Sequence, residues 1–221
     1  MRLGFLASHN GSNMQAIIDA CRSGKIPASP VVVISNNRGS GALERATRAG
    51  IPAYHLSATT HPAPELLDQA IADTLTGHQV DLVLLCGYMK RLGSETLTRF
   101  AGSILNIHPS LLPDFGGQGL YGIHVHEQVL AAGANTTGAS VHLVDGEYDT
   151  GPVLARISVP VMVGDTPETL QARVLPFEHQ LYCDTLTRIA SGELHLPRIK
   201  PIAAASSASE KAFEGVGRVL E

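Results

Sequence analysis

The chain has 221 residues, 44% of them hydrophobic and 16% charged, and its 16 basic and 20 acidic side chains give a formal net charge of −4. This composition is typical of a globular protein that buries a sizeable core, and it excludes an intrinsically disordered chain. Because the sequence has no basic run of the kind that follows a phosphate backbone, we do not expect a nucleic acid as its partner.

The cysteines and the N-terminal segment bear on the cellular compartment. Cys21, Cys86 and Cys183 are odd in number, far apart and without a C-x-x-C spacing. This pattern indicates free thiols in a reducing compartment, with neither a disulfide nor a zinc site. The N-terminal sequence MRLGFLASHNG contains an apolar run too short for a signal peptide or a membrane span. We therefore expect a cytoplasmic protein that does not associate with a membrane.

Strand-like runs alternate with helical repeats in the first half of the chain. Val31–Ser35 is mostly β-branched and almost entirely apolar, which predicts a strand covered on both faces. The other expected strands are Leu3–Ala7, Ala53–Leu56, Val80–Cys86 and Ser103–Ile107. The expected helices are Asn13–Cys21, Ala42–Ala49, Pro64–Thr76 and Ser94–Phe100. This alternation predicts right-handed crossovers and an α/β fold with a doubly wound, mostly parallel sheet.

The pattern changes after Pro109, where a glycine-rich loop is expected over Ser110–Gly122. The regular elements expected beyond it are a helix over His126–Ala132, strands over Gly138–Val144 and Val153–Val159, and a long helix from Thr166-Pro167 to about Ala190. The turn DGEYDTGP between the two strands predicts an antiparallel pair added to the sheet near its C-terminal end. We expect one domain over residues 1–200 and a loosely ordered tail over residues 201–221.

Ligands of an open parallel sheet bind beyond the carboxyl ends of its strands, and the first such turn here is ASHNGSNMQ. Gly11 allows the backbone to approach an anion, Ser12 offers a hydroxyl, and Asn13 begins a helix whose N–H groups point outward. An ordinary strand-to-helix turn is the alternative. The turn matches neither G-x-G-x-x-G nor G-x-x-x-x-G-K-[ST], which counts against a dinucleotide or ATP site.

A second candidate site lies in SILNIHPSLLPDF, where Asn106 and His108 stand at the end of a predicted strand and Pro109 stops its continuation. Side chains at i and i+2 of an extended strand point the same way, so the amide and the imidazole are expected to face one pocket. Asn can donate an N–H to a developing oxyanion, and His can exchange a proton near neutral pH. A buried histidine satisfied by a carbonyl group is the alternative.

The third segment is the turn VDGEYDTGP, which carries Asp145, Glu147 and Asp149. These acids are either turn formers or, for one of them, a partner that raises the pKa of His108 and orients its ring.

A metal site is a further alternative. His124 and His126 form an H-x-H pair that, with His108 and Asp149, would supply four nitrogen and oxygen ligands. The pair alone is weak evidence, and we expect no metal.

Taken together, these stretches resemble the phosphoribosylglycinamide formyltransferases, the folate-dependent glycinamide ribonucleotide transformylases of purine biosynthesis. The string N-I-H-P-S-L-L-P with a later D-x-G-P is a signature of folate formyl-transferring enzymes. N-G-S-N and R-V-x-x-x-E-H are specific to the glycinamide ribonucleotide branch. The matching stretches between Leu3 and Gly192 are NGSN, ISNN…ALERATRAGIP, CGYMKRL, ILNIHPSLLP, TGASVHLVDGEYDTGPVLAR and RVLPFEHQLY.

The resemblance implies a Rossmann-like formyltransferase fold and an enzyme that moves a formyl group from its cosubstrate, 10-formyltetrahydrofolate, to the amine of glycinamide ribonucleotide, without a metal. Asn106, His108 and Asp149 match the family's catalytic trio. Asn106 and His108 are expected to stabilise the oxyanion of a tetrahedral intermediate, and Asp149 to assist proton transfer. Small molecules are therefore the expected partners of a monomer or homodimer.

The resemblance also implies two sets of binding residues. The ribonucleotide set is Gly11, Ser12 and Asn13, which match the loop that holds the phosphate, and Glu178, which matches the acid that holds the ribose. The folate set is Met89, Lys90, Arg91 and Leu92, whose backbone is expected to read the pterin edge, with Asn106, Asp145, Gly146, Glu147, Tyr148 and Asp149.

The chain departs from the common family pattern in three places. His9 stands where a glycine is usual, which is expected to narrow the phosphate loop. The stretch DFGGQGLYGIHVH is longer than in the shorter members, so a flap over the substrate is expected to differ. The segment THPAPELLDQ lacks an arginine for the glutamate tail of folate.

Three other functions stay open. Enzymes that hydrolyse 10-formyltetrahydrofolate to formate usually carry an N-terminal regulatory domain, whereas this chain begins at its first predicted strand. A tRNA-acting formyltransferase would need a basic C-terminal domain, and the tail here is short and acidic. A nucleotide-binding module without chemistry would have no need of Asn106, His108 and Asp149 together.

Overall fold

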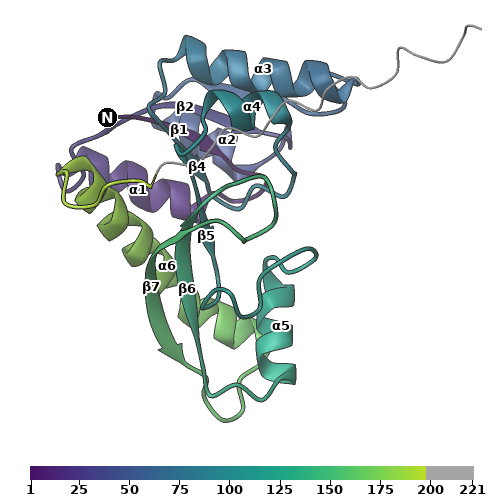
Figure 1. The fold of residues 1–221 in the computed structure, drawn as a ribbon, viewed down its shortest axis with the longest axis vertical. Coiled ribbons are helices and arrows are strands. Elements are labelled where there is room, and N and C mark those ends of the chain that lie inside the picture. The colour runs from purple at the N-terminus through teal and green to yellow at the C-terminus, as the bar shows by residue number, and fades with distance from the viewer. Residues whose placement is uncertain (198–221) are drawn as a thin grey trace, which may run out of the picture.

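A seven-stranded sheet forms the centre of the computed structural model, which describes residues 1–197 (Figure 1). The strands are β1 (Arg2–Leu6), β2 (Ser29–Ser35), β3 (Ala53–His55), β4 (Leu82–Leu85), β5 (Ile104–His108), β6 (Thr136–Leu143) and β7 (Val153–Pro160). The helices are α1 (Ser12–Arg22), α2 (Gly41–Arg48), α3 (Pro64–Gly77), α4 (Ser94–Arg99), α5 (Ile123–Ala131) and α6 (Pro167–Ala190). The predicted tail over residues 201–221 lies outside the described residues.

The strand order is β3-β2-β1-β4-β5-β6-β7. Neighbouring strands from β3 to β5 pair in parallel, whereas β6 pairs antiparallel with both β5 and β7. Winding reverses between β1 and β4, which is the place where open α/β sheets bind ligands. The predicted α/β fold, doubly wound and mostly parallel with an antiparallel pair at its C-terminal side, is confirmed.

Alternation along the buried strands gives the sheet two apolar faces. In β4, Leu84 packs into a core with α1, α2 and α6, whereas its neighbour Val83 packs into a second core with α3 and α4. Figure 1 shows α3 and α4 on one side of the strands and α1 and α6 on the other. Because both faces are covered, the central strands are apolar without interruption, as the sequence predicted for Val31–Ser35.

Helix α5 and the first half of α6 form a third, smaller apolar cluster with β7, centred on Val125, Val129 and Val174. Helix α5 begins at Ile123, earlier than the predicted His126, directly after Gly122, whose φ of 54° reverses the chain. Both histidines of the H-x-H pair therefore lie on this helix. Within residues 1–197, no helix combines the length and the apolar character that crossing a membrane requires.

Candidate active site

Polar side chains gather on one face of β5 and β6. The residues on either side of Asn106 belong to the core with α1, α2 and α6, so alternation turns Asn106 and His108 to the opposite face, as predicted. The antiparallel register sets His142 opposite Asn106 and Ser140 opposite His108. Two strands therefore supply four polar side chains to one small area.

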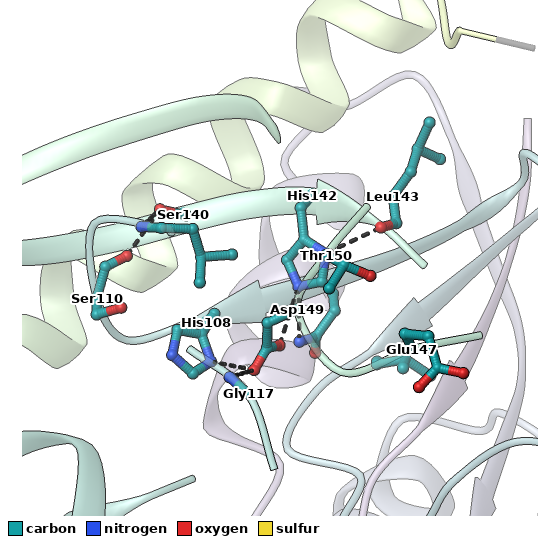
Figure 2. Close-up of polar contacts among 12 residues, drawn as sticks. His108, Ser110, Gly117, Ser140, His142, Leu143, Glu147, Asp149 and Thr150 are labelled. Carbon is teal, nitrogen blue, oxygen red and sulfur yellow. Dashed lines mark hydrogen bonds and ion pairs between the residues drawn. The ribbon is translucent and has the colours of Figure 1, made fainter. Parts of the chain in front are cut away.

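Ser140 anchors the loop that follows β5 (Figure 2). Its hydroxyl donates to the carbonyl oxygen of Ser110 at 2.7 Å and accepts the N–H of Leu112 at 3.0 Å. Because Ser140 is fully buried, these bonds tie the proline-rich loop down onto β6. The loop then runs back over the ring of His108.

His108 is buried, with 4% of its side chain exposed. A carbonyl oxygen can only accept, so the Nε2–H of His108 donates to the carbonyl of Phe115 at 2.8 Å. The other ring nitrogen, Nδ1, lies 3.5 Å from Oδ2 of Asp149. The alternative predicted for this histidine, a hydrogen bond to a carbonyl group, therefore explains the position of Nε2 only. The other nitrogen, Nδ1, faces an acid.

His142 is a site residue that the sequence analysis missed. Its Nδ1–H donates to the carbonyl of Leu143 at 2.9 Å, and its Nε2 lies 3.1 Å from Nδ2 of Asn106 and 3.4 Å from Oδ1 of Asp149. Its position opposite Asn106 depends on the register of β5 and β6, which no local motif encodes.

Asp149 joins the two imidazoles. Figure 2 shows its carboxylate between His108 and His142, and its Oδ2 also accepts the N–H of Gly117 at 3.0 Å. Its backbone is left-handed, with φ of 57°, a conformation that Asp tolerates better than most residues. Gly151 follows closely, and a Cβ there would lie 1.9 Å from the carbonyl oxygen of Leu143, so only glycine fits.

The site favours the neutral form of His108 and the ionised form of Asp149. Burial lowers the pKa of His108 below its usual range; the charge of Asp149 and the bond to Phe115 oppose this shift without reversing it. The effect expected of a nearby acid is present, because Asp149 raises the pKa of His108, but burial outweighs it and the net shift is downward. Burial alone would raise the pKa of Asp149, but the contact with His142, the charge of His108 and the Gly117 N–H together lower it. At neutral pH the site therefore holds a neutral His108 beside an ionised Asp149.

The geometry of the three residues suits proton transfer. Each imidazole donates one N–H to a carbonyl group. Its second nitrogen faces Asp149, and the two rings face different oxygens of that carboxylate. A proton added to either ring is thus stabilised by the same carboxylate. With the Nδ1–H of His142 donated to Leu143, the Asn106 amide can donate one N–H to Nε2 of His142 and keeps a second N–H for another acceptor.

A cavity of about 90 Å³ opens beside this cluster. Asn106, His142 and Asp149 line it, together with segments that the sequence analysis assigned to folate. The lining members of those segments are Lys90, Arg91, Leu92, Gly146, Glu147 and Tyr148. Met89 is not among the residues that line this cavity, and its N–H donates to the hydroxyl of Ser8 at 2.7 Å.

A second, wider cavity of about 1080 Å³ adjoins the first and shares Tyr88 and Lys90–Leu92 with it. The loops after β2 and β3 and the first turns of α3 form the rest of its wall. Arg38, Lys90 and Arg91 bring positive charge to this wall. The segment THPAPELLDQ contributes Thr60, Pro64, Leu67 and Asp68 to it.

The turn after β1 builds a separate cluster. Gly11 caps α1 with φ of 68°, and a Cβ there would lie 2.9 Å from Cβ of Ala42, so the turn needs glycine for its conformation and its packing. No side chain caps α1, which leaves the first N–H groups of the helix for a ligand. His9 is exposed, and its carbonyl accepts the N–H of Ala42 at 3.1 Å.

Glu178 reaches this cluster from α6. Asn13 donates an N–H to Oε2 of Glu178 at 2.9 Å, although the two residues are far apart in sequence. Burial raises the pKa of Glu178 to about 7, against the opposing effect of the Asn13 bond. The Oδ1 of Asn13 is buried without a partner among the described residues. The structure thus brings together all four residues predicted for the ribonucleotide.

Ser8 connects the turn after β1 to the segment after β4. Its N–H donates to the carbonyl of Gly87 at 3.0 Å, and its hydroxyl accepts from Met89 and donates to Oδ1 of Asn36 at 2.6 Å. These bonds fix the loops of β1, β2 and β4 relative to one another at the point where the winding reverses. Ser8 is a second residue that the sequence analysis missed.

The H-x-H pair does not act as one unit. His124 is half exposed and pairs with Glu127 at 2.9 Å, whereas His126 is fully buried. Burial lowers the pKa of His126 to about 4. Among residues 1–197, no group of three or more His, Cys, Asp or Glu side chains is arranged to hold a metal ion. The metal alternative therefore lacks a ligand set in this part of the chain.

Comparison with known proteins gives consistent matches over this fold. A profile of the formyl transferase family matches residues 1–186. The phosphoribosylglycinamide formyltransferase of Escherichia coli (strain K12) is 39% identical over 196 residues, which cover 89% of this chain and 90% of that protein. A crystal structure of glycinamide ribonucleotide transformylase 1 from Symbiobacterium toebii is 42% identical with a TM-score of 0.84, covering 89% of this chain and 91% of that one.

A plant relative is similar over a shorter share of its own length. The chloroplastic phosphoribosylglycinamide formyltransferase of Arabidopsis thaliana is 42% identical over 189 residues, which cover 85% of this chain and 65% of the plant protein. The chain thus spans just under two thirds of that relative.

Proposed function

This chain belongs to the formyl transferase family, and we propose that it transfers a formyl group from 10-formyltetrahydrofolate to the amine of glycinamide ribonucleotide in purine biosynthesis. The observation that carries the proposal is the convergence of Asn106, His108 and Asp149 beside a cavity lined by the segments that match the folate site. The separate cluster of Gly11, Asn13 and Glu178 supplies the second binding position that a two-substrate reaction requires.

The two clusters suit chemically different ligands. An uncapped helix N-terminus with a glycine turn favours an anion, so the phosphate of the ribonucleotide would lie at Gly11, Ser12 and Asn13. Glu178 would accept hydroxyl groups of the ribose. The folate ring would occupy the cavity beside Asn106, and its charged tail would run toward the positive wall of the wider cavity.

In the chemical step, the substrate amine attacks the formyl carbon, and the carbonyl oxygen becomes an oxyanion. The free N–H of Asn106 would stabilise that oxyanion. His108, which starts neutral, would add to this stabilisation once the proton lost by the amine reaches its ring. The amine nitrogen must lose a proton and the departing folate nitrogen must gain one. Asp149 would carry this proton, directly or through a water, because it is ionised and already contacts both imidazoles.

The test is a formyl-transfer assay with 10-formyltetrahydrofolate, run with and without glycinamide ribonucleotide. We expect formylated ribonucleotide when the amine is present and negligible formate when it is absent. Release of formate without the amine would instead establish hydrolysis. Binding of either ligand without turnover would favour the module without chemistry.

Ser12→Asp tests the phosphate position. The change places a negative charge at the first residue of α1, where the substrate phosphate is proposed to lie. We expect the KM for the ribonucleotide to rise at least tenfold, roughly the factor that one repulsive charge contact produces, and the KM for the folate to stay within about twofold. Equal rises in the KM values for both substrates would show that the phosphate does not bind at this turn.

Glu178→Gln tests the buried acid through stability as well as binding. Because the folded-state pKa of Glu178 is raised to about 7, its stabilising contribution is complete at acid pH and is lost as the pH rises through that value. The glutamine variant avoids this loss, so we expect it to be more stable than the parent at pH 8 by on the order of 3 kcal/mol, and equally stable near pH 4.

The same variant should bind the ribonucleotide less tightly, because a neutral amide is a weaker acceptor for ribose hydroxyls than a carboxylate. Urea unfolding at both pH values and the KM for the ribonucleotide measure the two effects. Glu193→Gln is the matched control, since its side chain is 63% exposed. If the variant is no more stable than the parent at pH 8, ionisation of the buried Glu178 does not destabilise the folded protein.

A further inference from the structure

Arg91 holds the turn between β6 and β7 from outside. Its Nε and Nη2 donate to the carbonyl oxygen of Gly146 at 3.1 and 2.7 Å, and Nη2 also lies 2.7 Å from Oε1 of Glu147. Its Cζ lies 5.9 Å from the ring centroid of Tyr148. One guanidinium thus contacts three consecutive residues of the turn.

Few hydrogen bonds within the turn stabilise its conformation. The carboxylate of Asp145 accepts the hydroxyl of Thr150 at 3.0 Å and the N–H of Glu147 at 3.4 Å, which are bonds within the turn. Gly146 and Asp149 both have positive φ, of 103° and 57°. A left-handed Asp is a sparsely populated conformation that persists only when its surroundings hold it. The side chain of Asp149 is held from outside the turn by the Gly117 N–H and the two imidazoles. The residues just before it, Gly146 and Glu147, are held from outside by Arg91.

The cavity beneath the turn is too small for its proposed occupant. It encloses about 90 Å³, whereas sites for ring-containing ligands usually measure about 300 Å³ or more. Gly146, Glu147 and Tyr148 form part of its wall, and Arg91 lies on the boundary shared with the wider cavity. Outward movement of the turn would enlarge this cavity for a bicyclic ring, and that movement requires the contacts of Arg91 to break.

Those contacts are of a kind that breaks readily. The side chains of Arg91 and Glu147 are 55% and 71% exposed, and exposed ion pairs contribute little to stability. The two hydrogen bonds from Arg91 to the Gly146 carbonyl fix the orientation of the guanidinium, since only a planar guanidinium donates from two nitrogens to one oxygen in this way.

We propose that Arg91 is a positioning residue that latches the 145–149 turn closed over the cavity, releases it to admit the folate ring, and thereby sets the position of Asp149. The proposal rests on the proposed function for the identity of the ring. It predicts that the free protein is mostly closed and that loss of Arg91 opens the turn without unfolding the chain.

The first test needs no substrate. Amide hydrogen exchange of peptides covering residues 145–149 should become about tenfold faster in Arg91→Leu, with an unchanged melting temperature, because opening governs exchange in such segments. Arg91→Lys should exchange almost as fast as Arg91→Leu, since an ammonium cannot form these two hydrogen bonds. Arg99→Leu is the matched control: Arg99 pairs with Glu95 at 2.6 Å and Asp73 at 2.5 Å on the α3–α4 surface. Unchanged exchange in Arg91→Leu would overturn the latch.

The second test is the association rate of tetrahydrofolate, measured by stopped-flow fluorescence. An open turn should admit the ligand about threefold to tenfold faster in Arg91→Leu, since only the open fraction binds. Slower association would overturn the proposal, because Arg91 would then be a direct ligand contact. If neither protein binds tetrahydrofolate, the proposed function fails while hydrogen exchange still decides the latch.

Discussion

Asp149→Asn is expected to give a folded protein that binds both substrates and transfers the formyl group at least about a hundredfold more slowly, the usual effect of losing a positioned proton carrier. Asparagine adopts the left-handed conformation at this position as readily as aspartate, and its side-chain oxygen can still accept the N–H of Gly117. The change therefore removes the negative charge and little else. Because that charge is proposed to act mainly in the transition state, kcat should fall far more than either KM rises.

The same substitution has a consequence for His108 with a definite sign. The charge of Asp149 raises the pKa of His108 and so offsets part of the effect of burial. Removing the charge should lower the pKa further, which a titration of the imidazole by NMR measures directly. Asp73→Asn on α3 is the control, because Asp73 is an exposed acid that pairs with Arg99. Unchanged turnover together with an unshifted histidine would reduce Asp149 to a turn former.

Most of the fold was predictable because the sequence pattern of this sheet is local. Short apolar runs bounded by turn residues located every strand to within a few residues, as Val31–Ser35 illustrates against the observed β2. The error at the start of α5 has a local cause as well. Gly122 and the polar H-x-H stretch look like a loop in sequence, yet the positive φ of Gly122 lets the helix begin at once.

The candidate site was predictable only in part. The i, i+2 spacing was enough to place Asn106 and His108 on one face, and the resemblance added Asp149. His142 joins them through an antiparallel register that is fixed across the long connection from β5 to β6. The pKa of His108 depends on burial by the loop around Phe115, which spacing does not reveal. The cytoplasmic location, the one-domain organisation over residues 1–200 and the monomeric or homodimeric state stay predictions.

His108→Asn is expected to lower kcat by at least about a hundredfold, through loss of both a proton donor and an oxyanion contact. The variant also leaves the carbonyl of Phe115 without its buried donor, which should lower the free energy of unfolding by about 1–3 kcal/mol. Circular dichroism and the melting temperature show whether enough folded protein remains for the comparison. His124→Asn on α5 is the matched control, because it removes an exposed imidazole whose contacts, with Glu127 and Tyr121, are local in the sequence.

The pH dependence separates a chemical role of His108 from a structural one. Its pKa is lowered, so the neutral ring persists below the usual titration range and gains its proton only in more acidic solution. If the reaction starts from neutral His108, the kcat/KM of the parent should hold as the pH falls to about 6.5, the ordinary value for histidine, and decline only below it. The variant should keep its low activity across that range without this decline. Near-normal turnover, or an acid limb that survives the substitution, would remove His108 from the mechanism and leave Asn106 and Asp149 to act without it.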